Sequence, residues 1–168
     1  MDVLIVEDDD AIAEPLARGL ERERFSVQRV ATGAEALAAS TPDVVLLDLG
    51  LPDLDGIAVL TRLRSFTQVP VIVVSARTES DDKVEALDLG ADDFITKPFT
   101  EEEVLHSIKA RLEKKELLDE LDAFAHTVAH DLKNPLATLG GRLELAELQL
   151  GRADEATIRQ HLNAATNA

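Results

Sequence analysis

Charged and hydroxyl side chains follow four of the short aliphatic segments in this sequence. The set consists of Glu7, Asp8, Asp48, Ser75 and Lys97. A nucleophilic carboxylate, further carboxylates, a hydroxyl donor and a mobile ammonium are together the groups that transfer of a phosphoryl group to an aspartate requires. The set is rich in oxygen and has neither Cys nor paired His, which favours a hard cation, Mg²⁺ or Mn²⁺.

The aliphatic segments are typical of β-strands that alternate with helices. Expected strands cover residues 3–6, 25–30, 44–48, 70–75 and 93–96, and expected helices cover 11–23, 32–39, 56–64, 80–89 and a segment that begins at 100. This alternation predicts an α/β fold with a doubly wound parallel sheet, flavodoxin-like, in the strand order 2-1-3-4-5. A lone Asp at a strand end is more often a helix cap. The joint placement of the set at one rim of the sheet supports the chemical interpretation.

No strand pattern recurs after residue 111, and two apolar stripes occupy the helical remainder. Leu105, Ile108 and Leu112 form the first stripe. The second stripe consists of Leu117, Leu121, Phe124, Val128, Leu132, Leu136, Leu139, Leu143 and Ala146. At about 100° per residue the two stripes point in roughly opposite directions. We therefore expect the first stripe to pack on the sheet and the second to pack on another helix.

The second stripe needs a partner, which we expect to be a second copy of the chain. Residues 151–153 interrupt the helical pattern, and residues 155–168 can form another helix. These features predict an α-helical hairpin that dimerises as a four-helix bundle with coiled-coil packing, a homodimer formed through about residues 117–168. A kinked helix that folds back on the sheet is the alternative.

A second candidate site surrounds His130, on the helix face roughly opposite the second stripe. Asp131 can orient the imidazole or accept its proton, and Asn134 lies one turn further on the same side. Pro135 inside a helix frees a backbone carbonyl. A lone surface His usually has no role, and a zinc site formed with His126 lacks an evident third ligand.

Composition argues against several classes of protein. The formal net charge of −16 is unfavourable for binding a phosphate backbone unaided, so no nucleic acid partner is expected. Cys is absent, and no apolar stretch approaches the roughly 20 residues of a membrane span. With no signal peptide before Asp2, we expect a cytoplasmic protein without membrane insertion.

Four motifs stand at the predicted rim: VEDD at residues 6–9, DLGLPDLDG at 48–56, VSA at 74–76 and FITKPF at 94–99. Together they resemble the motifs of receiver domains of two-component response regulators, over about residues 2–115, which makes 1–115 the expected receiver domain. The resemblance implies that Asp48 is phosphorylated and that Ser75 and Lys97 hold the phosphoryl oxygens. It further implies Mg²⁺ held by Asp8, Asp48 and the main-chain carbonyl of Gly50, Glu7 in the outer pocket, Phe94 as a switch aromatic and a cis Lys97–Pro98 bond.

The sequence HDLKNPL at residues 130–136 resembles the phospho-acceptor box of histidine kinases, in their dimerisation and histidine-phosphotransfer (HisKA-type) region. This likeness covers about residues 116–168, the expected second domain. It implies that His130 is phosphorylated, that Asp131 is the adjacent acid and that Asn134 positions phosphate or water. No ATP-binding domain follows in this sequence. We therefore expect no autophosphorylation with ATP alone, and partnership with such a domain, a kinase or a response regulator.

Three functions remain open at this point. The first is a receiver, phosphorylated on Asp48, that regulates a histidine kinase module carrying His130 through a continuous helix, by bending near residues 113–116. The second is a non-enzymatic response regulator whose helical tail dimerises or recruits a partner. The third is a dimeric scaffold with an inert receiver. When a phosphodonor is supplied, phosphoryl label found on Asp48 alone favours the second function. Label that passes to or from His130 favours the first function, and the absence of label favours the third.

Overall fold

The computed structural model describes residues 1–77 and 80–166, with side chains for 1–77, 81–133, 157 and 159. The chain divides into two compact units, Met1–Leu117 and Leu118–Ala168. The predicted domains 1–115 and 116–168 stay predictions. Among the described residues, no helix is both long enough and apolar enough to cross a membrane.

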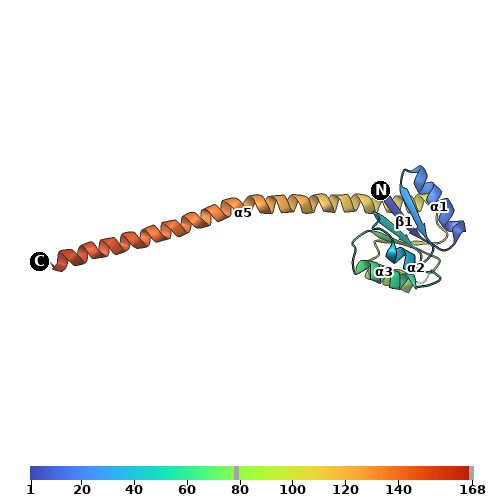
Figure 1. Ribbon diagram of the computed structural model, residues 1–168, viewed down its shortest axis with the longest axis horizontal. Coiled ribbons are helices and arrows are strands. Elements are labelled where there is room, and N and C mark those ends of the chain that lie inside the picture. The colour runs from blue at the N-terminus through green and yellow to red at the C-terminus, as the bar shows by residue number, and fades with distance from the viewer. Residues whose placement is uncertain (78–79, 167–168) are drawn as a thin grey trace. The chain divides into compact units, whose positions relative to one another are not determined.

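Five parallel strands form the sheet of the first unit (Figure 1). They are β1 (Asp2–Val6), β2 (Ser26–Val30), β3 (Val44–Leu47), β4 (Val71–Ser75) and β5 (Asp93–Thr96). Their order is β2-β1-β3-β4-β5, and each neighbouring pair is parallel. The predicted flavodoxin-like fold is confirmed. Because β1 pairs with β3, the carboxyl ends of these two strands lie side by side.

In the described residues, helices connect or follow the strands. They are α1 (Asp10–Arg22), α2 (Gly33–Ala38), α3 (Gly56–Arg64), α4 (Ser80–Asp88) and α5 (Glu101–Thr166). Thr32 caps the N-terminus of α2, since its Oγ1 accepts from the Glu35 N–H at 3.2 Å, and the Glu35 carboxylate accepts from the Ala31 N–H at 3.1 Å. Gly90, at φ +99°, follows α4 in a conformation that favours glycine.

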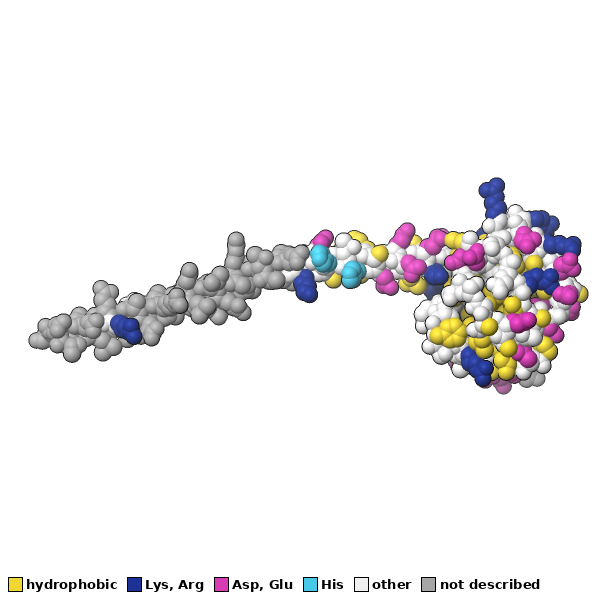
Figure 2. Space-filling model, in the orientation of Figure 1, with side chains coloured by type: hydrophobic (Ala, Val, Ile, Leu, Met, Phe, Trp, Pro, Cys, Tyr) yellow, Lys and Arg dark blue, Asp and Glu magenta, His cyan; other side chains and the backbone are white. Residues whose placement is uncertain are grey.

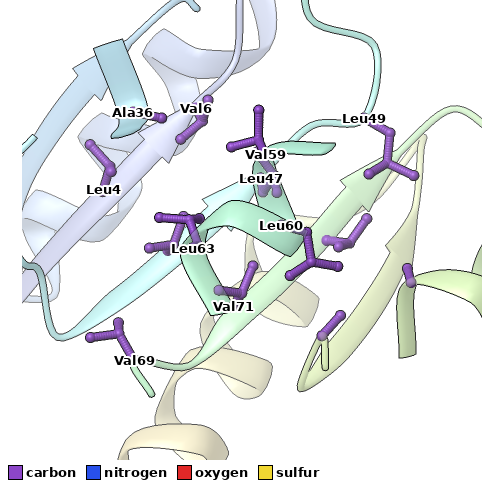
Figure 3. Packing of buried hydrophobic residues seen from close by; sticks show 14 of the residues in the cluster. Leu4, Val6, Ala36, Leu47, Leu49, Val59, Leu60, Leu63, Val69 and Val71 are labelled. Atoms are coloured by element: carbon purple, nitrogen blue, oxygen red, sulfur yellow. The ribbon is translucent and has the colours of Figure 1, made fainter. Parts of the chain in front are cut away.

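Alternate strand residues enter two cores, one on each face of the sheet, because successive side chains of a strand point to opposite faces. On one face, Val59, Leu60 and Leu63 of α3 point toward the side chains of the neighbouring strands (Figure 3). On the other face, α1 and the first part of α5 cover the strands. Both cores are mostly aliphatic, as the low aromatic content requires, with the buried Phe94 in the first and the partly buried Phe25 and Phe99 beside the second.

The first apolar stripe of α5 packs on the sheet as predicted. Ile108 is fully buried and Leu112 nearly so, whereas Leu105 only borders the core. Val104, which the stripe did not include, is fully buried beside them. The buried face of α5 is thus turned slightly from the predicted one.

The described members of the second stripe are exposed in the single chain (Figure 2). They are Leu117, Leu121, Phe124, Val128 and Leu132, whose exposed fractions run from 37% to 66%. The side chains of Leu136, Leu139, Leu143 and Ala146 lie outside the described residues. Exposed apolar faces of this kind commonly mark interaction surfaces.

The predicted break at residues 151–153 is wrong, and with it the helical hairpin. The backbone of α5 stays helical from Glu101 to Thr166. A glycine in a helix interior costs only about 1 kcal/mol relative to alanine, and residues 148–156 otherwise contain good helix formers such as Leu, Gln, Arg, Glu and Ala. Gly151 alone therefore does not end the helix.

A polar cluster anchors the first part of α5 to β5. The Asp93 carboxylate accepts hydrogen bonds from Ser107 Oγ and from the Phe94 N–H, and it pairs with Arg111 Nη2 at 3.3 Å. Burial alone would raise the pKa of Asp93, but the bonds from Ser107, Phe94 and Arg111 outweigh it and hold the pKa below its usual value. The charged form of Asp93 therefore contributes to the attachment of α5.

Replacing Asp93 by Asn should make the free energy of unfolding depend less on pH in the acidic range. The pKa of Asp93 is lower in the folded than in the unfolded state, so its contribution is present above the unfolded value and is lost as pH falls through the folded value. We expect Asp93→Asn to lower the free energy of unfolding by about 1 kcal/mol at pH 7. As pH falls, the variant should lose less stability than the wild type. Urea unfolding from pH 7 to pH 3 measures both effects, with Asp88→Asn, an exposed site, as the charge-matched control. Identical pH profiles for Asp93→Asn and wild type would contradict the assignment.

Candidate functional site

Three carboxylates meet at the carboxyl ends of β1 and β3. Oxygen atoms of Glu7, Asp8 and Asp48 all lie within 4.8 Å of one another. The strands set this spacing, because the Asp48 N–H donates to the Val6 carbonyl at 2.9 Å and the Glu7 N–H donates to the Val30 carbonyl at 3.1 Å. Glu7 and Asp48 are buried and Asp8 is exposed, so the cluster opens to solvent on one side.

Lys97 closes the cluster from the end of β5. Its Nζ donates to Glu7 Oε2 at 2.7 Å and to Asp48 Oδ2 at 2.9 Å. The Lys97 N–H donates to the Ser75 carbonyl at 2.8 Å, which ties the residue to the end of β4. One ammonium thus bridges two buried carboxylates, as the joint placement at the rim predicts.

The charges of the cluster shift the pKa of Glu7 and of Lys97. Burial raises the pKa of Glu7; the hydrogen bond from Lys97 opposes this and the Asp48 charge adds to it, so the value lies above the usual one. Burial acts to lower the pKa of Lys97, but its bonds to Glu7 and Asp48 prevail and raise it. Two of the three carboxylates therefore share one ammonium, and a cation at this position would relieve the mutual repulsion of all three.

The remaining predicted receiver residues lie at the same rim. Ser75 is buried at the end of β4, and its Oγ accepts from the Arg77 N–H at 3.1 Å. Phe94 on β5 is buried in the core beneath the rim. A Cβ atom at Gly50 would lie 3.5 Å from Asp48 Oδ2, which places this glycine directly beside the carboxylate. The Lys97–Pro98 bond is cis, as predicted.

Residues to which the sequence suggested no role hold the β3–α3 loop (residues 48–55). Asp53 accepts from the Ala34 and Gly33 N–H groups of α2, and these bonds lower its pKa. Arg77 Nη2 donates to the Leu49 carbonyl at 3.3 Å and contacts Asp55 Oδ2 at 3.4 Å. Asp55 directly precedes α3, and an Asp in that position is a recognisable capping signal. No sequence pattern, however, links Arg77 to the Leu49 carbonyl 28 positions earlier.

His130 and Asp131 belong to the second unit and stand exposed on α5, where histidine side chains are visible in Figure 2. His130 Nδ1 lies 3.4 Å from Asp131 Oδ1, so the acid contacts the imidazole as the sequence suggested. The side chain of Asn134 lies outside the described residues. Among described residues the only group of three potential metal ligands is Glu7, Asp8 and Asp48, so His126 and His130 gain no third ligand.

The donor set of the rim fits Mg²⁺ or Mn²⁺. Both are hard cations that prefer carboxylate and carbonyl oxygen, and three carboxylates converge here with one side open. Neither nitrogen nor sulfur ligands come from the described residues of this cluster. The chemistry of the site therefore agrees with the predicted metal.

The chain belongs to the response regulator receiver domain family of two-component systems, whose model matches residues 3–109. Receiver domains bind Mg²⁺ at an acidic pocket, and Glu7, Asp8 and Asp48 form such a pocket here. The family model leaves residues 110–168 unmatched, so likeness to a histidine kinase region is not shown. The family places the function of the first unit in two-component signal transduction.

Two curated relatives carry transcriptional names. Transcriptional regulatory protein KdpE of Mycobacterium tuberculosis is 47% identical over 123 residues, which cover 71% of this chain and 54% of that protein. Transcriptional regulatory protein PrrA of the same species is 44% identical over 117 residues, covering 67% and 50%. The chain thus spans about half the length of these curated relatives. Among solved structures, a Francisella response regulator receiver domain superposes with a TM-score of 0.65 at 32% identity, covering 68% of this chain and 98% of that one.

Proposed function

We propose that this chain is a phosphoryl-accepting receiver and that the acceptor is Asp48. The observation that supports this best is the buried Asp48 carboxylate, hydrogen-bonded at 2.9 Å to Lys97 Nζ. An Asp that served only as a cap would not need an ammonium that it shares with a second buried carboxylate, Glu7. Buried, paired charges at the carboxyl ends of parallel strands are typical of functional sites.

The reaction is a displacement at phosphorus. An Asp48 oxygen attacks the phosphoryl group, a new O–P bond forms as the bond to the donor breaks, and the donor leaves with the electron pair. The product is an acyl phosphate. Lys97 Nζ and Ser75 Oγ–H donate to the phosphoryl oxygens, and Lys97 exchanges its bond to Asp48 for one to the phosphoryl group.

Mg²⁺, or Mn²⁺ in its place, is the cofactor that we assign to the rim. Asp8, Asp48 and the main-chain carbonyl of Gly50 would hold it, with Glu7 in the outer pocket. When bound, the ion neutralises negative charge on the carboxylates and on the phosphoryl oxygens. These residues supply oxygen ligands only, as this ion requires.

In this proposal the receiver acts on its partners through the helical tail, the part of α5 from residue 118 onward. Leu117, Leu121, Phe124, Val128 and Leu132 form an exposed apolar face at helical spacing, which a second copy of the chain covers in a homodimer. The transcriptional names of the relatives favour a non-enzymatic regulator, and they give no support to the prediction that nucleic acid is not a partner. In this function, phosphorylation changes which partner the tail binds.

Histidine phosphotransfer at His130 is the second candidate function. The observation in its favour is the exposed imidazole with Asp131 3.4 Å from its Nδ1. His130 lies on the helix face opposite the apolar stripe, so a dimer formed through the stripe leaves the imidazole accessible. In this function His130 and Asp48 exchange a phosphoryl group, and an ATP-binding partner domain supplies it.

Radiolabelled acetyl phosphate tests the proposal with the intact chain. With Mg²⁺ we expect stoichiometric label that hydroxylamine removes, as is characteristic of an acyl phosphate, and no label after chelation of the metal. Label that survives mild alkali, which cleaves an acyl phosphate, but is lost in acid would assign the acceptor to His130 instead. Absence of label under both conditions would favour an inert receiver and overturn the proposal.

A further inference from the structure

The N-terminus of α2 is capped by two separate parts of the chain. Thr32 Oγ1, from the segment that enters the helix, accepts from the Glu35 N–H at 3.2 Å. Asp53, from the β3–α3 loop, accepts from the Gly33 N–H at 2.8 Å and from the Ala34 N–H at 2.9 Å. Because the first N–H groups of a helix have no partner within it, each of these bonds satisfies an otherwise free donor.

The β3–α3 loop also packs directly against the start of α2. A Cβ atom at Gly33 would come within 2.6 Å of Val59 Cγ2 and 3.1 Å of Leu54 Cβ, so the contact leaves no room for a side chain. The backbone of α2 is therefore a support for the loop. Asp53 is the residue that joins this support to the loop by hydrogen bonds.

The same loop carries Gly50, whose main-chain carbonyl we assigned to the metal. Gly50 lies beside Asp48, since a Cβ there would be 3.5 Å from Asp48 Oδ2. Other hydrogen bonds hold the ends of the loop: the Gly56 N–H donates to the Leu49 carbonyl at 3.1 Å, Arg77 Nη2 donates to the same carbonyl at 3.3 Å, and Asp55 accepts from the Ile57 N–H at 3.0 Å. Asp53 restrains the middle of the loop from the side of α2.

We infer that Asp53 is a positioning residue, which holds the β3–α3 loop so that the Gly50 carbonyl and Asp48 present their oxygens to one cation. This role rests on the proposed function of the rim. Groups that orient metal ligands without touching the metal commonly change metal affinity by about 10-fold or more when they are removed. Asp53 acts on the ligand set through the backbone, with no contact to the ion.

Thr32 provides a matched control, because it caps the same helix from the segment that enters α2 and not from the β3–α3 loop. Thr32→Ala removes a bond to α2 but none to the loop. Asp53→Ala removes two bonds to α2 and releases the loop. Both variants should lower the midpoint of thermal unfolding. Only Asp53→Ala should weaken Mg²⁺ binding, by about 10-fold.

Isothermal titration calorimetry of the intact chain with Mg²⁺ measures the affinity, since the sequence has no Trp or Tyr for intrinsic fluorescence. Asp53→Asn retains one acceptor oxygen and should give an intermediate dissociation constant, and it serves if Asp53→Ala does not fold. A wild-type affinity in both Asp53 variants would overturn the inference, as would an equal loss in Thr32→Ala. A wild-type chain that neither binds Mg²⁺ nor takes up phosphoryl label would instead overturn the proposed function, and this role with it.

Discussion

An Asp48→Asn chain should take up no phosphoryl label above background from acetyl phosphate, yet it should be at least as stable as the wild type. The amide has the shape of the carboxylate but is neither a comparable nucleophile nor a charged metal ligand. Its neutral side chain also removes one of three carboxylates whose oxygens lie within 4.8 Å of one another. Because Lys97 keeps its 2.7 Å bond to Glu7, the ammonium retains an ionic partner.

Asp43→Asn is the matched control for this substitution, at the other end of the same strand. Asp43 Oδ2 accepts from the Asp2 N–H at 2.8 Å, far along β3 from the rim. We expect wild-type phosphoryl uptake and a loss of stability of at most about 1 kcal/mol. Phosphoryl label, measured for both variants, reports the loss of the acceptor. Urea unfolding of the same variants reports their stability, so the two effects can be separated. Residual label in Asp48→Asn that mild alkali removes would show that another carboxylate accepts the group.

The sheet and its rim were predictable because the relevant signals are local and the topology rules are strong. Aliphatic runs locate the strands, parallel strands share a carboxyl edge, and β1 pairs with β3 in this fold. Those three steps bring Glu7 and Asp48 together although they follow different strands of the sequence. The same rule, applied to β5, predicts that Lys97 lies at this edge of the sheet.

The supports of the rim were not predictable in the same way. Asp53 bonds to α2 and Arg77 bonds to the Leu49 carbonyl through contacts between loops, which depend on loop conformation and on the packing of α2 against α3. Hydrophobic periodicity carries no information about such contacts. A close approach such as that of Gly33 to Val59 likewise follows from tertiary packing.

The C-terminal helix shows a different limit of sequence reasoning. The glycine at position 151 suggests a break in the helical pattern, although good helix formers surround it and α5 continues through it. The two apolar stripes were a stronger signal, because each is defined by several residues at a regular spacing. The burial of Ile108 and the exposure of Leu121 agree with that division.

Gly56→Ala should destabilise the receiver by about 3 kcal/mol and reduce phosphoryl uptake at the same time. A Cβ atom at this position would lie 2.5 Å from the Asp48 carbonyl oxygen and 2.5 Å from Leu49 Cα. Both are backbone atoms, which no change of rotamer can move. The substitution must therefore displace the Asp48–Leu49 backbone or the start of α3, and either shift moves the acceptor carboxylate relative to Lys97.

Gly50→Ala separates this steric effect from a general intolerance of the loop to side chains. A Cβ at Gly50 meets Asp48 Oδ2 at 3.5 Å, an ordinary van der Waals distance, and Gly50 is exposed. We expect its unfolding free energy to stay within about 0.5 kcal/mol of wild type. Urea unfolding and phosphoryl uptake of the two variants test the difference. Equal stability of Gly56→Ala and Gly50→Ala would mean that the backbone at Asp48 yields easily, which is incompatible with a rigidly held acceptor.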